Sequence, residues 1–334
     1  MAIVTGSRVK IGYQVCLKLL RAGATVIGTT RFPNSAVSSF RNEKDFDEWK
    51  DHLQIYGLDL RDVVSLEAFC QYLKHKFGHV GIDIIINNAC QTVRRPTAYY
   101  KPLVEKEETL WHERDHVHTN ILLSCVEFER IRRQLMISHA SPLVIENQPK
   151  QTSLLPPNEV EVNSRYPNVI INDAIIPSST QSYVIVEKDG LDLKDSSFEA
   201  TGIAFSAAMT QTCLLPDDVG IHSSHLPPGL SDINGQQLDL RTTNSWILKM
   251  GEVSTPEIME CIFINALAPF VLNSRLKPLM TTPNTDTRPD RYIINVSAME
   301  GKFYRYKTPN HPHTNMAKAA LNMLTRTSSE DLAR

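Results

Sequence analysis

Short apolar runs alternate with amphipathic stretches through the first part of the chain. Strands are predicted at residues 1–5, 24–30, 53–60 and 82–86, the last of them almost continuously apolar. Between the strands, apolar residues recur every three or four positions, which predicts helices at 11–22, 46–52 and 64–77. Apolar strands that alternate with helices are typical of a parallel sheet covered on both faces. The predicted fold class is therefore α/β, with a doubly wound, Rossmann-type parallel sheet.

The same pattern resumes near residue 257. A long helix is predicted at 258–280, a strand at 291–296 and a helix at 314–332. Residues 101–252 do not follow this alternation of strands and helices. The predicted core is therefore 1–100 plus 253–334, with a large insertion between the two parts. The insertion opens with a charged helix at 107–137 and continues with a segment rich in Pro, Asn, Ser and Gln at 148–168. Apolar runs at 169–176 and 183–186 predict an added strand pair, so the insertion is expected to be partly helical and partly loose.

Composition excludes several classes of protein. Lys and Arg number 35 against 37 Asp and Glu, a net charge of −2 that offers no basic field for nucleic acid. No apolar run approaches the roughly 20 residues of a membrane-spanning helix, and no secretory signal is evident. The six cysteines are scattered without a C-x-x-C pair, which favours reduced thiols and a cytoplasmic location.

Residues suited to a nucleotide follow three of the predicted strands. The first strand leads into Thr5-Gly-Ser-Arg-Val-Lys-Ile-Gly12, a glycine turn that would present backbone N–H groups to phosphate at a helix N-terminus. Asp59-Leu60 follows the third strand and Asn87-Asn-Ala-Cys90 follows the fourth. Ligands bind such sheets at the carboxyl ends of the strands, where these segments meet.

These segments resemble the short-chain dehydrogenase/reductase family, whose landmarks are T-G-x-x-x-G-x-G, a D-hydrophobic pair and N-N-A-G. The resemblance implies a nicotinamide cofactor and a set of cofactor-binding residues: Thr5, Gly6, Arg8, Lys10, Ile11, Gly12, Arg31, Asp59, Leu60, Asn87, Asn88, Ala89 and Lys318. Lys10 replaces the middle glycine, and we expect it to contact the pyrophosphate rather than point to solvent. Cys90 replaces the last glycine of N-N-A-G and is expected to be a small buried residue.

Arg31 bears on the choice of cofactor. It follows the second strand, where an acidic residue would contact the ribose hydroxyls of NAD, and a basic residue suits the 2′-phosphate of NADP. NADP is therefore favoured over NAD, the alternative being that Arg31 is a solvated surface residue.

The resemblance continues near the C-terminal end and implies the catalytic residues. Asn265 matches the asparagine of the family's central helix, and Asn120 is its rival in this sequence. Ser297 matches the serine that orients the substrate carbonyl. Lys318 matches the lysine of Y-x-x-x-K, and Thr314 stands at the position of the usual catalytic tyrosine.

Thr314 is the most consequential departure, because an aliphatic hydroxyl is a far weaker acid than a phenol. A positioned general acid is worth roughly 100- to 10,000-fold in rate. Tyr306 and Tyr304 are the preferred substitutes, ahead of His311 and His313. The alternative is that all four are loop residues with packing or surface roles.

One further motif predicts different chemistry. Residues 112–116 read His-Glu-Arg-Asp-His, which matches H-E-x-x-H and on one helix would place two imidazoles a turn apart for zinc. The surrounding charged residues favour a solvated helix face instead, and no metal ligand is predicted.

The leading hypothesis is an NAD(P)-dependent oxidoreductase for a small-molecule carbonyl or alcohol. The alternatives are a nucleotide-binding pseudoenzyme with a regulatory role and, more distantly, a zinc hydrolase. The resemblance also implies pairing with a second copy. Family members continue into further strands beyond the helix of Lys318, so the core is expected either to be truncated there or to be covered by the insertion.

Overall fold

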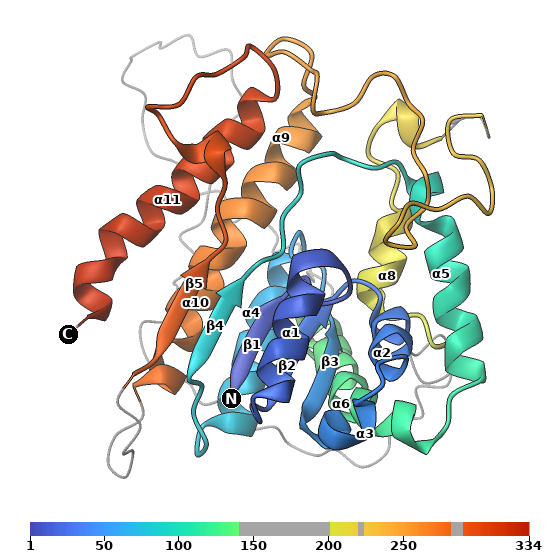
Figure 1. The fold of residues 1–334 in the computed structure, drawn as a ribbon, viewed down its shortest axis with the longest axis vertical. Coiled ribbons are helices and arrows are strands. Elements are labelled where there is room, and N and C mark those ends of the chain that lie inside the picture. The colour runs from blue at the N-terminus through green and yellow to red at the C-terminus, as the bar shows by residue number, and fades with distance from the viewer. Residues whose placement is uncertain (140–200, 220–223, 282–289, 334) are drawn as a thin grey trace, which may run out of the picture. The chain divides into compact units, whose positions relative to one another are not determined.

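The computed structural model describes residues 1–139, 201–219, 224–281 and 290–333. Its sheet contains β1 (Ala2–Thr5), β2 (Val26–Thr30), β3 (Leu53–Gly57), β4 (Ile84–Asn87) and β5 (Tyr292–Asn295) (Figure 1). The strand order is β3-β2-β1-β4-β5 and all four pairings are parallel, as in the register Ile3 to Ile27 and Ile85. This confirms the predicted α/β class with a doubly wound parallel sheet.

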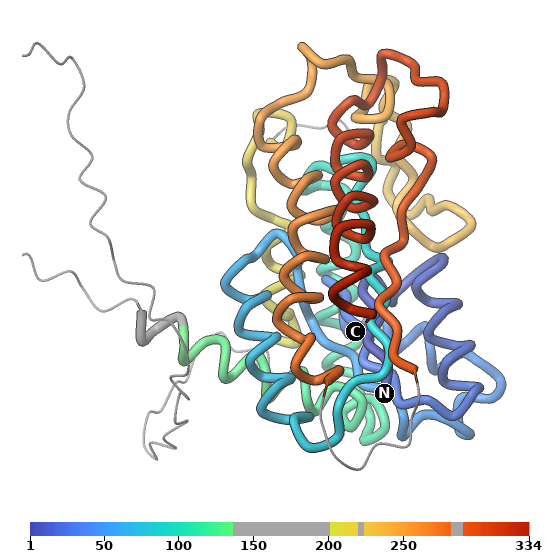
Figure 2. The backbone as a smooth tube through the Cα atoms, turned by 90° about the vertical axis from the view of Figure 1, so that its left-hand side faces the viewer, coloured from blue at the N-terminus to red at the C-terminus, as the bar shows by residue number. Residues whose placement is uncertain are grey.

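Helices cover both faces of the sheet. The first half supplies α1 (Lys10–Arg21), α2 (Pro33–Arg41), the short α3 (Phe46–Trp49) and α4 (Val63–Phe77). The last part supplies α9 (Thr255–Ile262), α10 (Ala268–Met280) and α11 (Pro312–Leu332). In Figure 2, α4 and α10 lie on one side of the strands and α1 lies on the other. The apolar core fills the space between these layers, which is why the strand residues of β1 and β2 are fully buried.

The long predicted helix at 258–280 is present, with a local change of winding. A π-helical turn, Phe263–Leu267, joins α9 to α10. Such turns disrupt the regular backbone hydrogen bonds, and here the Asn265 side chain donates to the carbonyl oxygen of Cys261 at 2.8 Å. By length and composition alone, Thr255–Met280 is apolar enough to cross a membrane, a test that the core helix of a folded domain also passes. Half of its apolar window is buried, as in the core helix of a folded domain.

The predicted single helix at 107–137 is wrong. The chain instead forms α5 (Thr97–His112) and α6 (His116–His139), separated by a break at 113–115. Asp115 begins α6 as its N-cap, because its side chain accepts from the backbone N–H of His118 at 2.9 Å.

The described part of the predicted insertion packs on the core. Figure 1 shows α5 beside α2, and α6 contacts β3 and α4. The short α8 (Phe205–Ala208) also contacts β3. The predicted loose segment at 148–168 and the strand pair at 169–176 and 183–186 lie outside the described residues. The division into core and insertion at 100 and 253 stays a prediction.

Candidate cofactor and catalytic site

The glycine turn after β1 is built for close backbone approach. Gly6 has a positive φ of 71°, a conformation that residues with a side chain seldom adopt. A Cβ on Gly12 would lie 2.1 Å from the Gly6 carbonyl oxygen and 2.4 Å from Asn88 Nδ2, so only glycine fits there. The turn therefore packs directly against the segment that follows β4.

Hydrogen bonds join the ends of β1 and β4. The hydroxyl oxygen of Thr5 accepts from the backbone N–H groups of Asn88 and Ala89, each at 3.0 Å, and Asn88 Nδ2 donates to the Thr5 carbonyl oxygen at 3.0 Å. Asn87 points the other way, and its amide donates to the side-chain oxygens of Asn273 and Asn295 at 2.8 Å. Thr5, Asn88 and Ala89 thus shape the glycine turn, whereas Asn87 ties β4 to β5 and α10.

A cavity of about 410 Å³ lies at the carboxyl ends of the strands. It brings together most of the predicted cofactor-binding residues: Gly6, Arg8, Lys10, Ile11, Arg31, Asp59, Leu60, Asn88 and Ala89. Cys90, Gln91 and Ile264 line it as well, and Cys90 is exposed there rather than buried as expected. Ser297, Thr314 and Lys318 are not among its lining residues in the described part of the chain.

Lys10 begins α1 in a strained conformation. Its φ is 55°, which places a residue with a Cβ in the left-handed region. Lys10 and Ile11 are both exposed at the mouth of the cavity. The position of Lys10 at the N-terminus of α1 suits a contact with phosphate.

Two arginines gather at one end of the cavity. The guanidinium carbons of Arg8 and Arg31 lie 5.5 and 5.8 Å from the ring centroid of Phe32. Arg31 Nη2 also donates to the hydroxyl of Tyr100 on α5, at 3.1 Å. Arg8 makes no ion pair within the described residues, so its charge is available to a ligand. Burial lowers the pKa of Arg8, and the positive charge of Arg31 adds to that effect.

Asp59 is engaged within the protein. Its carboxylate is buried and accepts from the guanidinium of Arg61, with a shortest distance of 2.7 Å. Burial raises the pKa of Asp59, but the bonds from Arg61 outweigh it and hold the net pKa below its usual value.

The lysine and serine predicted to be catalytic lie next to each other at the end of β5. Lys318 is buried on α11, and its Nζ donates to the carbonyl oxygen of Val296 at 3.0 Å. The hydroxyl oxygen of Ser297, the next residue, is buried without a hydrogen-bond partner in the described residues. Burial lowers the pKa of Lys318.

Thr314 is buried one turn before Lys318 and lies against α9. Its hydroxyl is 3.9 Å from the sulfur of Cys261, which in turn lies 3.5 Å from Asn265 Nδ2. Asn265 also donates to the Gln91 carbonyl oxygen at 2.8 Å, and its Oδ1 is buried without a partner in the described residues. Asn120, the rival, lies exposed on α6. The structure therefore brings Asn265, Thr314 and Cys261 together.

The candidate substitutes for the tyrosine occupy different environments. Tyr304 and Tyr306 are 75 % and 90 % exposed, so acting beside Lys318 would require their loop to move. His311 stacks on Trp246 with ring centroids 4.1 Å apart. His313 is buried with Nε2 3.8 Å from a Glu257 carboxylate oxygen, and burial lowers its pKa. A role for any of them as the acid stays a prediction.

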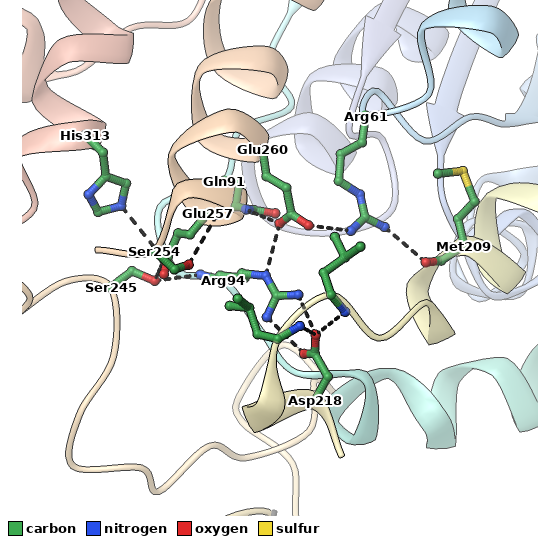
Figure 3. Close-up of polar contacts among 12 residues, drawn as sticks. Arg61, Gln91, Arg94, Met209, Asp218, Ser245, Ser254, Glu257, Glu260 and His313 are labelled. Atoms are coloured by element: carbon green, nitrogen blue, oxygen red, sulfur yellow. Dashed lines mark hydrogen bonds and ion pairs between the residues drawn. The ribbon is translucent and has the colours of Figure 1, made fainter. Parts of the chain in front are cut away.

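A buried ionic network, which the sequence did not indicate, surrounds Glu260 and Arg94 and reaches the cavity at Gln91 (Figure 3). Glu260 on α9 accepts from Arg61 and from Gln91, each at 3.0 Å, and lies 3.4 Å from Arg94. Arg94 forms a bidentate pair with Asp218 at 2.7 and 2.9 Å. Its members come from four separate segments, so no local motif could have revealed it. The network holds the segment after β4, which carries Gln91, against α9 and the described end of the predicted insertion.

The zinc hypothesis fails on geometry. His112 ends α5 and His116 begins α6, so the two imidazoles do not lie one turn apart on a single helix. Among the described residues, no group of three or more His, Cys, Asp or Glu side chains could hold a metal ion.

Comparisons with known proteins agree with this architecture. Residues 1–127 match the family model described as short chain dehydrogenase. The chain is 27 % identical over 329 residues to the uncharacterized protein R665 of Acanthamoeba polyphaga mimivirus, covering 97 % of this chain and 49 % of R665. It is 34 % identical over 89 residues to (+)-neomenthol dehydrogenase of Capsicum annuum, covering 26 % of this chain and 28 % of that enzyme. The chain thus spans half or less of these two relatives.

Among solved structures, an NADPH-bound carbonyl reductase from chicken fatty liver aligns with a TM-score of 0.44 and 13 % identity, covering 99 % of this chain and 73 % of that one. The family match covers β1 to β4, and the landmarks of the glycine turn and of Asn87-Asn-Ala lie within it. Residues 1–127 of the chain are therefore similar to the short-chain dehydrogenase family.

Proposed function

We propose that this chain binds a nicotinamide dinucleotide, NADP in preference to NAD, and acts as an oxidoreductase on a small-molecule carbonyl or alcohol. The observation that carries the proposal is the bond from Lys318 to Val296, which sets the lysine beside Ser297 at the sheet edge where the glycine turn lies. A cytoplasmic location and pairing with a second copy stay predictions.

The residues present fit such a cofactor. The turn from Gly6 to Gly12 leaves room only for backbone, which suits a pyrophosphate. Arg8 and Arg31 offer two positive charges to a 2′-phosphate at one end of the cavity. Ser297 Oγ and Asn265 Oδ1 do not line this cavity, but both are buried without partners in the described residues, which suits polar groups of a ligand.

The side chains then have distinct roles. When bound, the nicotinamide supplies or accepts the hydride. Ser297 would orient the substrate oxygen by donating its hydroxyl proton in a hydrogen bond. The charge of Lys318 would hold the ribose and favour negative charge on that oxygen, and Asn265 would support proton relay. Because Thr314 is a weak acid, we expect turnover roughly 100- to 10,000-fold slower than with a phenol at this position.

Binding and turnover together test the proposal. The full chain is titrated with NADPH and NADH, followed by protein fluorescence, and is then assayed with a panel of aldehydes, ketones and secondary alcohols. We expect tighter binding of NADPH and slow turnover that Ser297→Ala abolishes. Ser274→Ala, an exposed serine on α10, is the matched control and should leave turnover unchanged. Absence of NADPH binding, or binding without turnover of any substrate, would overturn the oxidoreductase assignment.

A further inference from the structure

The turn that follows β2 is held by residues outside the family pattern. The Arg31 carbonyl oxygen accepts from the hydroxyl of Ser206 at 3.0 Å. The Asn34 amide donates to the Gly202 carbonyl oxygen at 2.8 Å. Both partners come from the described end of the predicted insertion, and α5 and α6 supply further contacts through Glu107, Tyr100 and His118. The conformation of this turn therefore depends on the insertion.

Glu107 of α5 closes the N-terminus of α2. Its two carboxylate oxygens accept from the backbone N–H groups of Asn34 at 2.9 Å and Ser35 at 2.6 Å, and the side chain is fully buried. Free N–H groups at a helix N-terminus are the usual place for an anion. Here a protein carboxylate already uses them, so an anion at this end of the cavity has to be bound by side chains.

Tyr100 holds in place the side chain of Arg31, which would bind such an anion. Its hydroxyl accepts from Arg31 Nη2 at 3.1 Å, and the Arg31 guanidinium carbon lies 4.4 Å from the centroid of its ring. The ring also stacks on Phe32, with centroids 5.9 Å apart. Arg8 contacts the same Phe32 ring, so the two guanidinium groups are set on one aromatic surface that lines the cavity.

We propose that Tyr100 is a positioning residue for a phosphomonoester on the adenosine ribose of the cofactor, acting by holding Arg31 beside Arg8. The inference rests on the proposed function, because it assumes that this cavity end takes the adenosine 2′-phosphate. Paired guanidinium groups match the geometry and charge of such a group. An arginine fixed in place by an aromatic hydroxyl loses less side-chain entropy on binding than a free one.

The test uses two ligands that differ only in that phosphate. Isothermal titration of the full chain measures the dissociation constants of adenosine 2′,5′-bisphosphate and of 5′-AMP. For the unchanged chain, we expect the bisphosphate to bind at least about tenfold more tightly, as for a phosphate held by charged hydrogen bonds. Tyr100→Phe removes one hydroxyl and keeps the ring. It should raise the dissociation constant of the bisphosphate about three- to tenfold and change that of 5′-AMP by less than about twofold.

Tyr13→Phe is the matched control. The Tyr13 hydroxyl donates to the Ser39 carbonyl oxygen at 3.1 Å and to Glu43 at 2.7 Å, and Tyr13 does not line this cavity, so the loss of its hydroxyl should change neither dissociation constant. Arg31→Ala should abolish the preference, because it removes the guanidinium that Tyr100 holds. Thermal unfolding of each variant establishes that it is folded before titration.

The outcomes separate the inference from the proposed function. Equal binding of the two ligands by the unchanged chain would overturn both the preference for NADP and the role of Tyr100. A preference that survives Tyr100→Phe in full would overturn the inference alone. If Tyr100→Phe weakened the binding of both ligands equally, the role of Tyr100 would be merely structural, and the inference would be overturned as well.

Discussion

Lys318 Nζ donates a hydrogen bond to the carbonyl oxygen of Val296 at 3.0 Å, tying α11 to the end of β5. The bond satisfies a buried ammonium group and fixes the rotation of α11 relative to the sheet. Thr314 lies one turn earlier on the same helix, and its hydroxyl lies 3.9 Å from the sulfur of Cys261, which contacts Asn265. Under the proposed function, we therefore expect the identity of residue 314 to decide which proton donor the site has.

Replacing Thr314 by tyrosine tests that consequence. A phenol close to the Lys318 charge should have its pKa lowered from about 10 and become an effective acid. We expect Thr314→Tyr to raise the NADPH-dependent rate by roughly 100-fold or more.

Thr314→Phe is the control, since it adds the same ring without the hydroxyl and should give no gain. Circular dichroism establishes that both variants accommodate the ring beside Cys261. Equal rates in the two variants would show that the proton comes from elsewhere, and loss of activity in Tyr306→Phe would then identify that source.

Glu107 should make stability depend on pH. Burial raises its pKa to about 7, above the value of about 4.3 in an unfolded chain. Between these values the folded protein binds more protons than the unfolded one, so this group's contribution to the free energy of unfolding falls as pH rises.

We expect the stability advantage of the unchanged chain over Glu107→Gln to narrow from pH 4.5 to 7, by at most about 1.4 kcal/mol per pH unit. Urea unfolding at several pH values measures it. Glu105→Gln, on the exposed face of the same helix, should show no such trend. A gap that stays constant with pH would contradict the raised pKa of Glu107.

The pair Arg94–Asp218 should be required for stability. Both side chains are buried, and the Asp218 carboxylate also accepts from the backbone N–H groups of Leu214 and Leu215. Asp218→Asn leaves the arginine charge without its bidentate partner, which typically costs about 3–5 kcal/mol. Asp217→Asn, at the exposed neighbouring position, should cost less than about 1 kcal/mol. Similar denaturation midpoints for the two variants would disprove the importance of the buried pair.

Lys10 should be strained by its positive φ of 55°. Glycine adopts this conformation without the Cβ clash that costs other residues about 1–2 kcal/mol. We therefore expect the free energy of unfolding of Lys10→Gly to exceed that of Lys10→Ala by about 0.5–1 kcal/mol. This difference allows for the greater entropy that glycine gives the unfolded chain. Both variants remove the same charge, so urea unfolding compares the backbone effect alone. An alanine variant as stable as the glycine variant would argue against strain.

Local sequence predicted the sheet well because its signals are local. The apolar runs around Ile3 and Ile27 can be buried only as central strands, and their order with the helices implies parallel pairing. The helix α2 went unpredicted although Pro33 at its first turn is a start signal, because it is only 9 residues long. The break between α5 and α6 was missed because the charged pattern runs on across Asp115, the residue that caps α6.

The sequence by itself determined the α/β sheet, the glycine turn and the alignment of Ser297, Thr314 and Lys318 with a family site, because these depend on short-range patterns. Only the tertiary structure decided that Glu107 closes α2, that Tyr100 holds Arg31, and that Glu260 joins Arg61 to Gln91. Each of these contacts links residues about 70 or more positions apart. Such pairings follow from how the layers pack and carry no periodic signal along the chain.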